Sequence, residues 1–575
     1  MRFPHFPLRP LTRTVLTPGG LSPSDATDRY TFRHTENLIT EGGRTRTHSP
    51  KSPLVSPGSG DGLTVVRTEE GEQLCYPEGH DLVVGTRHYP LALKDTAHRL
   101  IPFGDLILIF PERKYLRLSD GEIGMLDASL TTDGATLFTL CRADGSPYTA
   151  MTVSDTAPAS PAHGDVWLDT AFKPVLLRRF STARQEWQTV TDTYLRISAA
   201  GIGRPFRAGD TVRLTNVIPA ELKHLEGLHR LLACEEDHLV ISAPPCVTVR
   251  QMAPLGVTRR MPDLDPDTLL VWRDRLVGAA QAVNEDGTTV TLLCAGRAGD
   301  PFNWEPTDGD VNAARQWRVA YAEPITASAV YHGMPHFFSE QSVLALTGEG
   351  TSARWQMTPL AGVMDGCGES LKEVGGVLCY RSRSGMMCYD GKQVTALPPL
   401  PWDTRPRAAS AGILGDRYYL SLIREDGRSD LLVCNVAERV WSRLDHTRAA
   451  HFTPYRGGLC YRDGCDGAIR AMGDTASVDD MSAIQWEATT APLWIRDQNG
   501  ARLSRAELML TLSEGGEAQI LTVDGKGNRA CPIEVSGRGE TPICVSIYPR
   551  ATDCFSLEIR GRGKVSLHEL TRITR

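Results

Sequence analysis

The residues best suited to acid–base or metal chemistry are two aspartates, Asp263 and Asp265, in the stretch Met-Pro-Asp-Leu-Asp-Pro. In an extended segment, residues two apart lie on one face, so these carboxylates could bind a cation or exchange a proton. The alternative is a turn in which the aspartates cap the entering strand through hydrogen bonds to the backbone. No third ligand or base lies nearby in the sequence, so we expect the turn.

A second candidate is Gly-Asp-Pro-Phe-Asn-Trp, residues Gly299–Trp304. This stretch could present an exposed aromatic ring to a ligand. More simply, Asp-Pro makes a turn and Trp304 packs between neighbouring sheets. Trp317 and Trp441 also lie near expected strand ends, and we expect the same packing role for them.

Two further pairs have the residue types of metal ligands. His332 and His336 have the i, i+4 spacing of a helical metal pair, but Gly333 and Pro335 oppose a helix. Cys460 and Cys465 flank a turn and have no second pair of zinc ligands. We therefore expect no metal at either pair.

Other catalytic and cofactor motifs are absent from the sequence. It contains no Walker loop, G-x-S-x-G, H-E-x-x-H or EF-hand loop. Glu235–His238 is expected to be a solvated turn, and Ala199–Pro205 lacks the strand–helix context of a dinucleotide loop. We expect no catalytic residues, no cofactor and no metal.

The elements around these residues follow a repeat of two apolar strands joined by a polar turn. Four regular copies begin near Met334, Val377, Tyr418 and Leu459, at spacings of 43, 41 and 41 residues. A period of about 40–50 residues with roughly four strands is typical of a β-propeller blade. The sequence therefore predicts an all-β protein with a propeller of five to seven blades, six being the best estimate.

Two earlier copies, Asp105–Gly121 and Asp274–Gly296, lie on either side of a break in the period. The break predicts an insertion, with a strand-turn-strand module over Thr156–Val190 followed by a small closed β-barrel. In the module, Trp167 and Trp187 are expected to pack on one face. A change of pattern near residue 479 predicts a terminal β-sandwich.

These patterns divide the chain into five parts. We expect an extended basic arm over 1–60, the first part of the propeller over 61–131 and the inserted modules over 132–258. The remainder of the propeller then covers 259–478 and the sandwich 479–575.

Charge and cysteine content limit the function classes. The net charge is −7, which gives no general basic face for nucleic acid, while residues 1–60 carry eight Lys/Arg against four Asp/Glu. Such an arm could dock on a neighbouring subunit or remain solvated. The 14 cysteines include no C-x-x-C pair, and several lie in apolar runs, which favours reduced core thiols. We expect neither a signal peptide nor a membrane helix.

Four stretches carry a resemblance to β-propeller tail proteins of bacteriophages and, more distantly, to the nozzle proteins of short-tailed phages. They are the Gly-Gly-containing start Leu16–Thr40, the entry Arg259–Ala280 with Cys294–Trp304, the hairpin Gly376–Gly391 and the terminal hairpin Ile547–Ile573. The module around Trp167 is similar to a small unit found in many phage structural proteins.

The resemblance implies a structural virion protein that is made and folded in the host bacterial cytoplasm. It would form a homo-oligomeric ring in the tail, a hexamer being the expectation, with a channel for transient, non-specific passage of phage DNA during ejection. Tail adaptor or connector proteins and tail fibres would be its neighbours.

Two alternatives remain open at this stage. One is a carbohydrate-binding receptor protein at the tail tip, using exposed tryptophans of the Trp167 type. The other is a propeller glycosidase, a class that often carries repeated Ser-x-Asp-x-Gly-x-x-Trp turns, of which the sequence has no copy.

Overall fold

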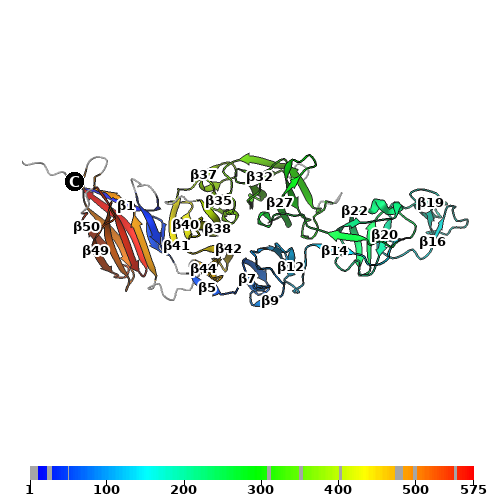
Figure 1. Ribbon diagram of the computed structural model, residues 1–575, viewed down its shortest axis with the longest axis horizontal. Coiled ribbons are helices and arrows are strands. Elements are labelled where there is room, and N and C mark those ends of the chain that lie inside the picture. The colour runs from blue at the N-terminus through cyan, green and yellow to red at the C-terminus, as the bar shows by residue number, and fades with distance from the viewer. Residues whose placement is uncertain are drawn as a thin grey trace, which may run out of the picture. The chain divides into compact units, whose positions relative to one another are not determined.

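The computed structural model describes residues 11–22, 29–48, 51–306, 312–348, 354–400, 405–472, 484–496, 501–549 and 553–575. Within these ranges the protein is almost entirely β-structure (Figure 1). The helical residues lie in short 3-10 turns, η1 (Ala220–Leu225), η2 (Pro266–Thr268) and η4 (Gly368–Ser370). The all-β prediction is confirmed.

The chain divides into two compact units. Unit 1 contains residues 1–102, 110–112 and 323–575, and unit 2 contains residues 103–109 and 113–322. The residues that form the sheet of β10 to β13 are divided between the two units.

Unit 1 contains five runs of four consecutively hydrogen-bonded strands. The first four runs are β6 (Thr64–Thr68), β7 (Gly71–Glu78), β8 (Asp81–Val84), β9 (Arg87–Tyr89); β30 (Ala327–Tyr331), β31 (Met334–Phe338), β32 (Ser342–Thr347), β33 (Arg354–Pro359); β34 (Lys372–Val374), β35 (Val377–Ser382), β36 (Gly385–Tyr389), β37 (Val394–Ala396); and β38 (Pro406–Leu414), β39 (Arg417–Arg424), β40 (Ser429–Asn435), β41 (Val440–Asp445). The fifth is β42 (Ala449–Tyr455), β43 (Gly458–Asp463), β44 (Ile469–Met472), completed by β5 (Ser52–Val55).

Two more four-stranded sheets complete the set. They are β10 (Arg99–Phe103), β11 (Leu106–Phe110), β12 (Lys114–Arg117), β13 (Ile123–Met125); and β26 (Leu270–Trp272), β27 (Arg275–Val283), β28 (Thr289–Ala295), β29 (Arg315–Val319). Outside the inserted residues 132–258, the described residues thus contain seven four-stranded arrangements, and the six hairpins recognised in the sequence lie in six of them. The repeat in the sequence does not predict the seventh arrangement, β6–β9.

The terminal sandwich is built from both ends of the sequence. Its strands are β1 (Thr12–Leu21), β2 (Arg29–Glu36), β3 (Leu38–Glu41), β4 (Arg44–Thr47), β45 (Gln485–Thr490), β46 (Leu493–Trp494), β47 (Leu503–Leu512), β48 (Glu517–Asp524), β49 (Arg529–Ser536), β50 (Ile543–Ile547), β51 (Cys554–Arg562) and β52 (Val565–Thr574). One sheet runs β2–β45–β51–β48–β49, and β52 pairs with β1, β4 and β47 in the other. Buried residues of both sheets, such as Leu508 and Ile559, belong to one core.

The prediction of an extended arm over residues 1–60 is wrong for the described part of that segment. β1 lies antiparallel to β52, with Thr12 opposite Thr574 and Leu16 opposite Leu570. Pro18 is accommodated at an irregular position, because the register of β1 against β2 shifts after it. Tyr30 and Phe32 of β2 are buried, so this segment supplies part of the core.

Unit 2 holds the insertion. Eight strands pair in the order β14 (Ala128–Thr131), β25 (Gly256–Arg259), β21 (Thr211–Thr215), β22 (Gly227–Glu235), β23 (His238–Ser242), β20 (Tyr194–Ser198), β15 (Thr136–Cys141), β24 (Val249–Gln251). The two end strands of this order are not paired with each other within residues 128–259, so the sheet is not the closed barrel expected.

The module is inserted in the sequence between two strands of that sheet, and does not precede the sheet. Its strands, β16 (Met151–Ser154), β17 (Val166–Asp169), β18 (Leu176–Ser181) and β19 (Glu186–Thr189), lie between β15 and β20 in the chain. Leu168 and Leu177 of the module belong to the same hydrophobic core as the eight-stranded sheet. The modular order expected from the sequence is therefore corrected: one β-domain contains the other.

Candidate functional site

The two aspartates that opened the sequence analysis form a turn. The Asp265 carboxylate accepts a hydrogen bond from the Asp267 backbone N–H at 3.0 Å and caps η2. Asp263 pairs with Arg113, its Oδ1 lying 2.6 Å from the guanidinium. Capping by Asp265 confirms the turn interpretation, and Arg113 supplies the cation that faces Asp263.

Trp304 is buried, with 2% of its surface exposed. Its indole N–H donates to the Pro301 carbonyl at 2.9 Å, and the Asp300 carboxylate accepts from Phe302 N–H in the same turn. The turn and the buried ring are confirmed. Trp441 is also buried, whereas Trp317 is half-buried.

The paired histidines and cysteines do not form a metal site. His332 stacks on Tyr331, and His336 contacts the Met334 carbonyl through Nδ1. Within the described residues no group of three or more His, Cys, Asp or Glu side chains is arranged to hold a metal ion. In the same residues, no helix is long and apolar enough to span a bilayer.

The sugar-binding hypothesis pointed to Trp167 as an exposed ring. Instead, Trp167 is 6% exposed and packs edge-on against Trp187 at 5.4 Å between ring centroids. This packing confirms the shared aromatic face of the module. It also removes Trp167 as a platform for a sugar, since a stacking sugar needs an open ring face.

A cluster of ionisable side chains in unit 1 was not visible in the sequence. His451 of β42 places Nε2 2.7 Å from Asp61 Oδ1 and Nδ1 3.0 Å from Glu369 Oε1. Asp61 precedes β6 and Glu369 lies on η4. The side chains of Asp61 and Glu369 are 53% and 43% exposed, and that of His451 is 16% exposed.

The electrostatics of this cluster favour a protonated histidine. Burial alone would lower the pKa of His451, but the Glu369 and Asp61 carboxylates raise it to about 10. Burial would raise the pKa of Glu369, yet His451, Lys372 and Arg99 hold it well below its usual value. The hydrogen bond from His451 lowers the pKa of Asp61 against the effect of burial.

This charge state decides what the cluster can do. An imidazolium that donates from both nitrogens has no lone pair with which to accept a proton. The carboxylates facing it are ionised and poor proton donors near neutral pH. The cluster of Asp61, Glu369 and His451, called the ionic clamp below, therefore links the segment before β6, η4 and β42, which lie far apart in the sequence. No local spacing connects positions 61, 369 and 451, which is why sequence motifs missed it.

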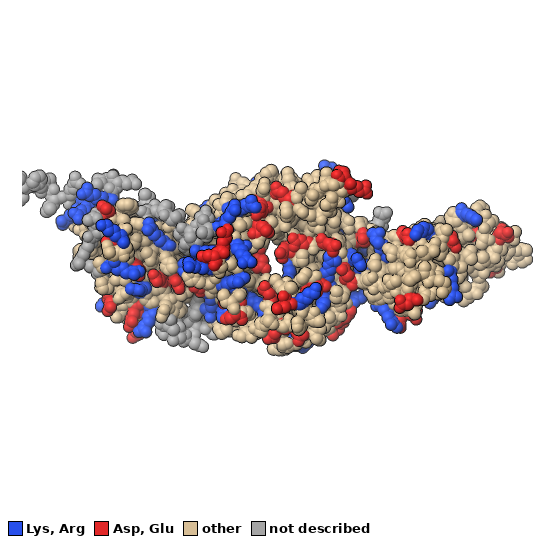
Figure 2. Space-filling view, in the orientation of Figure 1, with Lys and Arg blue, Asp and Glu red and all other residues tan. Residues whose placement is uncertain are grey.

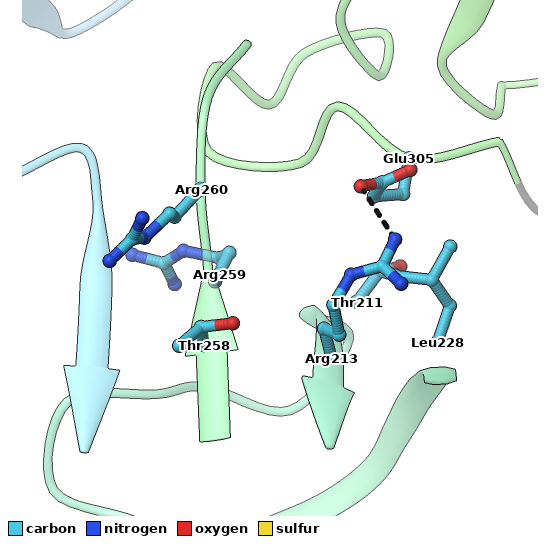
Figure 3. A pocket seen from close by; sticks show the side chains of 7 residues that line it. All are labelled: Thr211, Arg213, Leu228, Thr258, Arg259, Arg260 and Glu305. Atoms are coloured by element: carbon cyan, nitrogen blue, oxygen red, sulfur yellow. Dashed lines mark ion pairs between the residues drawn. The ribbon is translucent and has the colours of Figure 1, made fainter. Parts of the chain in front are cut away.

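A pocket of about 310 Å³ lies on the eight-stranded sheet (Figure 3). Arg213 faces Leu228 and Thr258 across neighbouring strands, so these three side chains share one face. The pocket is lined by Thr211, Arg213, Leu228, Thr258, Arg259, Arg260 and Glu305.

The charges of this pocket are mainly internal pairs. Arg259 is buried and pairs with Asp210, and Arg213 lies 3.6 Å from Glu305. Arg213 and Arg260 are both exposed, whereas Arg259 is buried. Such a lining could accept an anionic oxygen group, but it contains no paired acid and base for chemistry. Figure 2 shows acidic and basic side chains interspersed on the visible face rather than gathered by sign.

No protein-family model matches the chain, and no curated protein matches it. Among solved structures, an exo-β-1,3-galactanase from Phanerochaete chrysosporium is similar at 8% identity and a TM-score of 0.19, covering 53% of this chain and 94% of that one. The extracellular domain of a one-component system from B. thetaiotaomicron has 8% identity and a TM-score of 0.20, over 94% and 98%. A puromycin-hydrolyzing peptidase of Mycobacterium tuberculosis has 11% identity and a TM-score of 0.23, over 78% and 61%. Similarity at this level assigns no activity to the chain.

Proposed function

We propose that this chain is a non-enzymatic structural protein of a tailed bacteriophage virion, a ring component of the tail. The ring would surround the exit path of the DNA and hold adaptor or connector proteins and fibres. Four stretches of sequence, from Leu16–Thr40 to Ile547–Ile573, support the proposal through their resemblance to phage tail proteins. Six copies remain the expected number.

The proposal includes the architecture of the ring component. We infer that the five four-stranded runs of unit 1 are propeller blades, a fold for which the sequence predicts five to seven blades. The strand β5 supports this inference, because it completes the sheet of β42–β44 from a distant part of the sequence. Completion of the last blade by an early strand is how a propeller holds its first and last blades together.

The observation that carries the structural role is the pairing of early strands with late ones. β1 forms a five-residue antiparallel register with β52, and β2 pairs with β45. Through these pairs, strands from the start of the sequence complete the sheets formed by its last strands. A component that must keep its shape during assembly and DNA ejection would benefit from this arrangement.

The ionic cluster supports the non-enzymatic part of the proposal. Asp61 and Glu369 are two carboxylates that the fold brings to one histidine, and His451 binds both. A glycosidase needs one carboxylic acid and one free carboxylate across the scissile bond. The fixed imidazolium occupies the space between these two groups.

Two measurements test the proposal. Native mass spectrometry of the purified full chain should show a closed oligomer, and electron microscopy of phage particles carrying an epitope-tagged copy should place the label on the tail. A monomer that is absent from purified particles would contradict the proposal. Binding on a glycan array that is lost in Phe172→Ala would favour the receptor alternative, because Phe172 is an exposed ring of the module.

A further inference from the structure

Two cysteines face each other across the hairpin of β35 and β36. Cys379 and Cys388 are directly opposite in the antiparallel register, and their Sγ atoms lie 2.8 Å apart. Both side chains are buried, at 0% and 6% exposed. The expectation of reduced core thiols accounts for their burial but not for their mutual approach.

The hydrogen-bond pattern shows which kind of cross-strand pair they form. The N–H of Arg381 donates to Ser370 Oγ and its carbonyl accepts from Met364 N–H, so Arg381 points its backbone groups away from β36. The carbonyl of Met386, opposite Arg381, accepts from Leu397 N–H of the next strand segment. Arg381 and Met386 are therefore a non-hydrogen-bonded pair.

Pair types alternate along an antiparallel ladder, so every second pair is of the same type. Cys379 and Cys388 lie two positions from Arg381 and Met386 and are also a non-hydrogen-bonded pair. In such pairs the Cα atoms are about 4.5 Å apart and the side chains are closest. This separation falls within the range of about 4.4–6.8 Å that a disulfide spans.

We propose that Cys379 and Cys388 are an oxidation site that forms an intramolecular disulfide when the chain meets a peroxide. One thiol loses its proton, and the thiolate attacks the peroxide oxygen to give a sulfenic acid and hydroxide, which takes up that proton and leaves as water. The second thiol then attacks that sulfur, forming the S–S bond and releasing a second water. Two thiols and one hydrogen peroxide give one disulfide and two waters, so the thiols are oxidised and the peroxide is reduced. This inference is independent of the tail assignment.

The two thiols differ in their readiness to react. The hydrogen bond from Cys379 lowers the pKa of the Cys388 thiol, and the same bond together with burial raises the pKa of Cys379. Cys388 is also the more exposed of the two. Because Cys388 is the more exposed thiol, a peroxide reaches it first, and Cys379 resolves the intermediate.

Neighbouring cysteines provide the internal comparison. Cys434 is buried nearby on β40, in another sheet, and interacts electrostatically with Cys379 and Cys388. It has no residue of the hairpin opposite it in a strand register, since its cross-strand partners are Tyr418 and Trp441. Cys465 is exposed and reports whether the oxidant has acted.

Peptide mapping tests the proposal directly. Lys372, Arg381, Arg383 and Lys392 are trypsin sites that place the two cysteines in separate peptides, residues 373–381 and 384–392. The folded full chain is treated with hydrogen peroxide, the oxidant is removed, and the chain is unfolded in iodoacetamide and digested. We expect these two peptides as one linked species that separates on reduction, in wild type and in Cys434→Ala but not in Cys388→Ala.

A second measurement follows the folded protein. The disulfide closes a short loop, so oxidised wild type should unfold roughly 2–4 °C higher than reduced wild type. Cys388→Ala should show no such difference. The proposal is overturned if Cys465 is oxidised while Cys379 and Cys388 are both recovered alkylated, or if either is linked mainly to Cys434.

Discussion

At the scale of single residues, His451 is a side chain that forms ion pairs with two carboxylates at once. It has a positive φ of 50°, a conformation that asparagine tolerates better than most residues. Its two nitrogens bind carboxylates from two other segments, so its charge links three segments that the sequence keeps far apart.

We predict that His451→Asn destabilises the protein by about 1–2 kcal/mol. The value is below that for a fully buried pair because Asp61 and Glu369 remain partly solvated. The midpoint of urea unfolding measures the change. The double variant with Glu369→Gln should lose less than the sum of the two single variants; strictly additive losses would show that the two side chains do not interact.

The clamp also predicts a pH dependence. The raised pKa of His451 means that its contribution is fully present below pH 6.5, declines above it and is gone beyond about pH 10. The lowered pKa values of Asp61 and Glu369 mean that the stability contributed by these two carboxylates is present above about pH 4.5 and is lost in acid. The stability difference between wild type and His451→Asn should be largest between pH 4.5 and 6.5 and should shrink by pH 10. A difference that grows toward pH 10 would contradict this charge assignment.

Residue-level prediction from the sequence succeeded where the interaction is local. Asp265 caps a turn two residues away, and an aspartate beside a proline signals this directly. The partners of His451 lie 390 and 82 residues away. A bond of that kind depends on which strands become neighbours, and a single sequence does not contain this information.

At the scale of elements, the hairpins were found because their apolar strands and polar turns recur at a nearly constant period. The sequence does not predict the sheet β6–β9, because Pro77 lies within its second strand, β7, and weakens the apolar pattern. β1, β2 and β4 are not predicted because each has a partner more than 400 residues later in the chain. A short strand whose partner is distant has no local signature of its own.

The contact of β1 with β41 can be tested at one glycine. Gly20 has a φ of +71°, and a Cβ there would overlap Val440 and come within 2.7 Å of the Trp441 carbonyl. We predict that Gly20→Ala costs about 2–4 kcal/mol, from backbone strain and overpacking together.

Gly42 is a matched control, because its φ is +57° and no atom lies within 4 Å of the position that a Cβ would take. Gly42→Ala should cost only the strain, about 1 kcal/mol. Chemical denaturation of both variants measures the difference. Equal losses would show that the approach of β1 to β41 is not tight.

At the scale of the whole molecule, the two units have separate hydrophobic cores. Leu508 of β47 belongs to a core made of residues from unit 1, and Leu195 of β20 to a core made of residues from unit 2. Cores that do not share residues need not melt together.

We therefore predict two resolvable transitions in calorimetry. Leu508→Ala and Leu195→Ala both remove a fully buried leucine, and each should cost about 2–5 kcal/mol. Leu508→Ala should shift only one transition to lower temperature, and Leu195→Ala only the other. If both variants shift a single transition equally, the units unfold as one.

The pairing of β1 with β52 also has a consequence in time. Thr12 is synthesised more than 550 residues before its partner Thr574. At about 5–20 residues per second, that interval is roughly 30–110 s. Throughout it, the edge of β1 that pairs with β52 has no partner. The sandwich can therefore close only after β52 has been made, and until then β1 is open to pairing with a wrong neighbour.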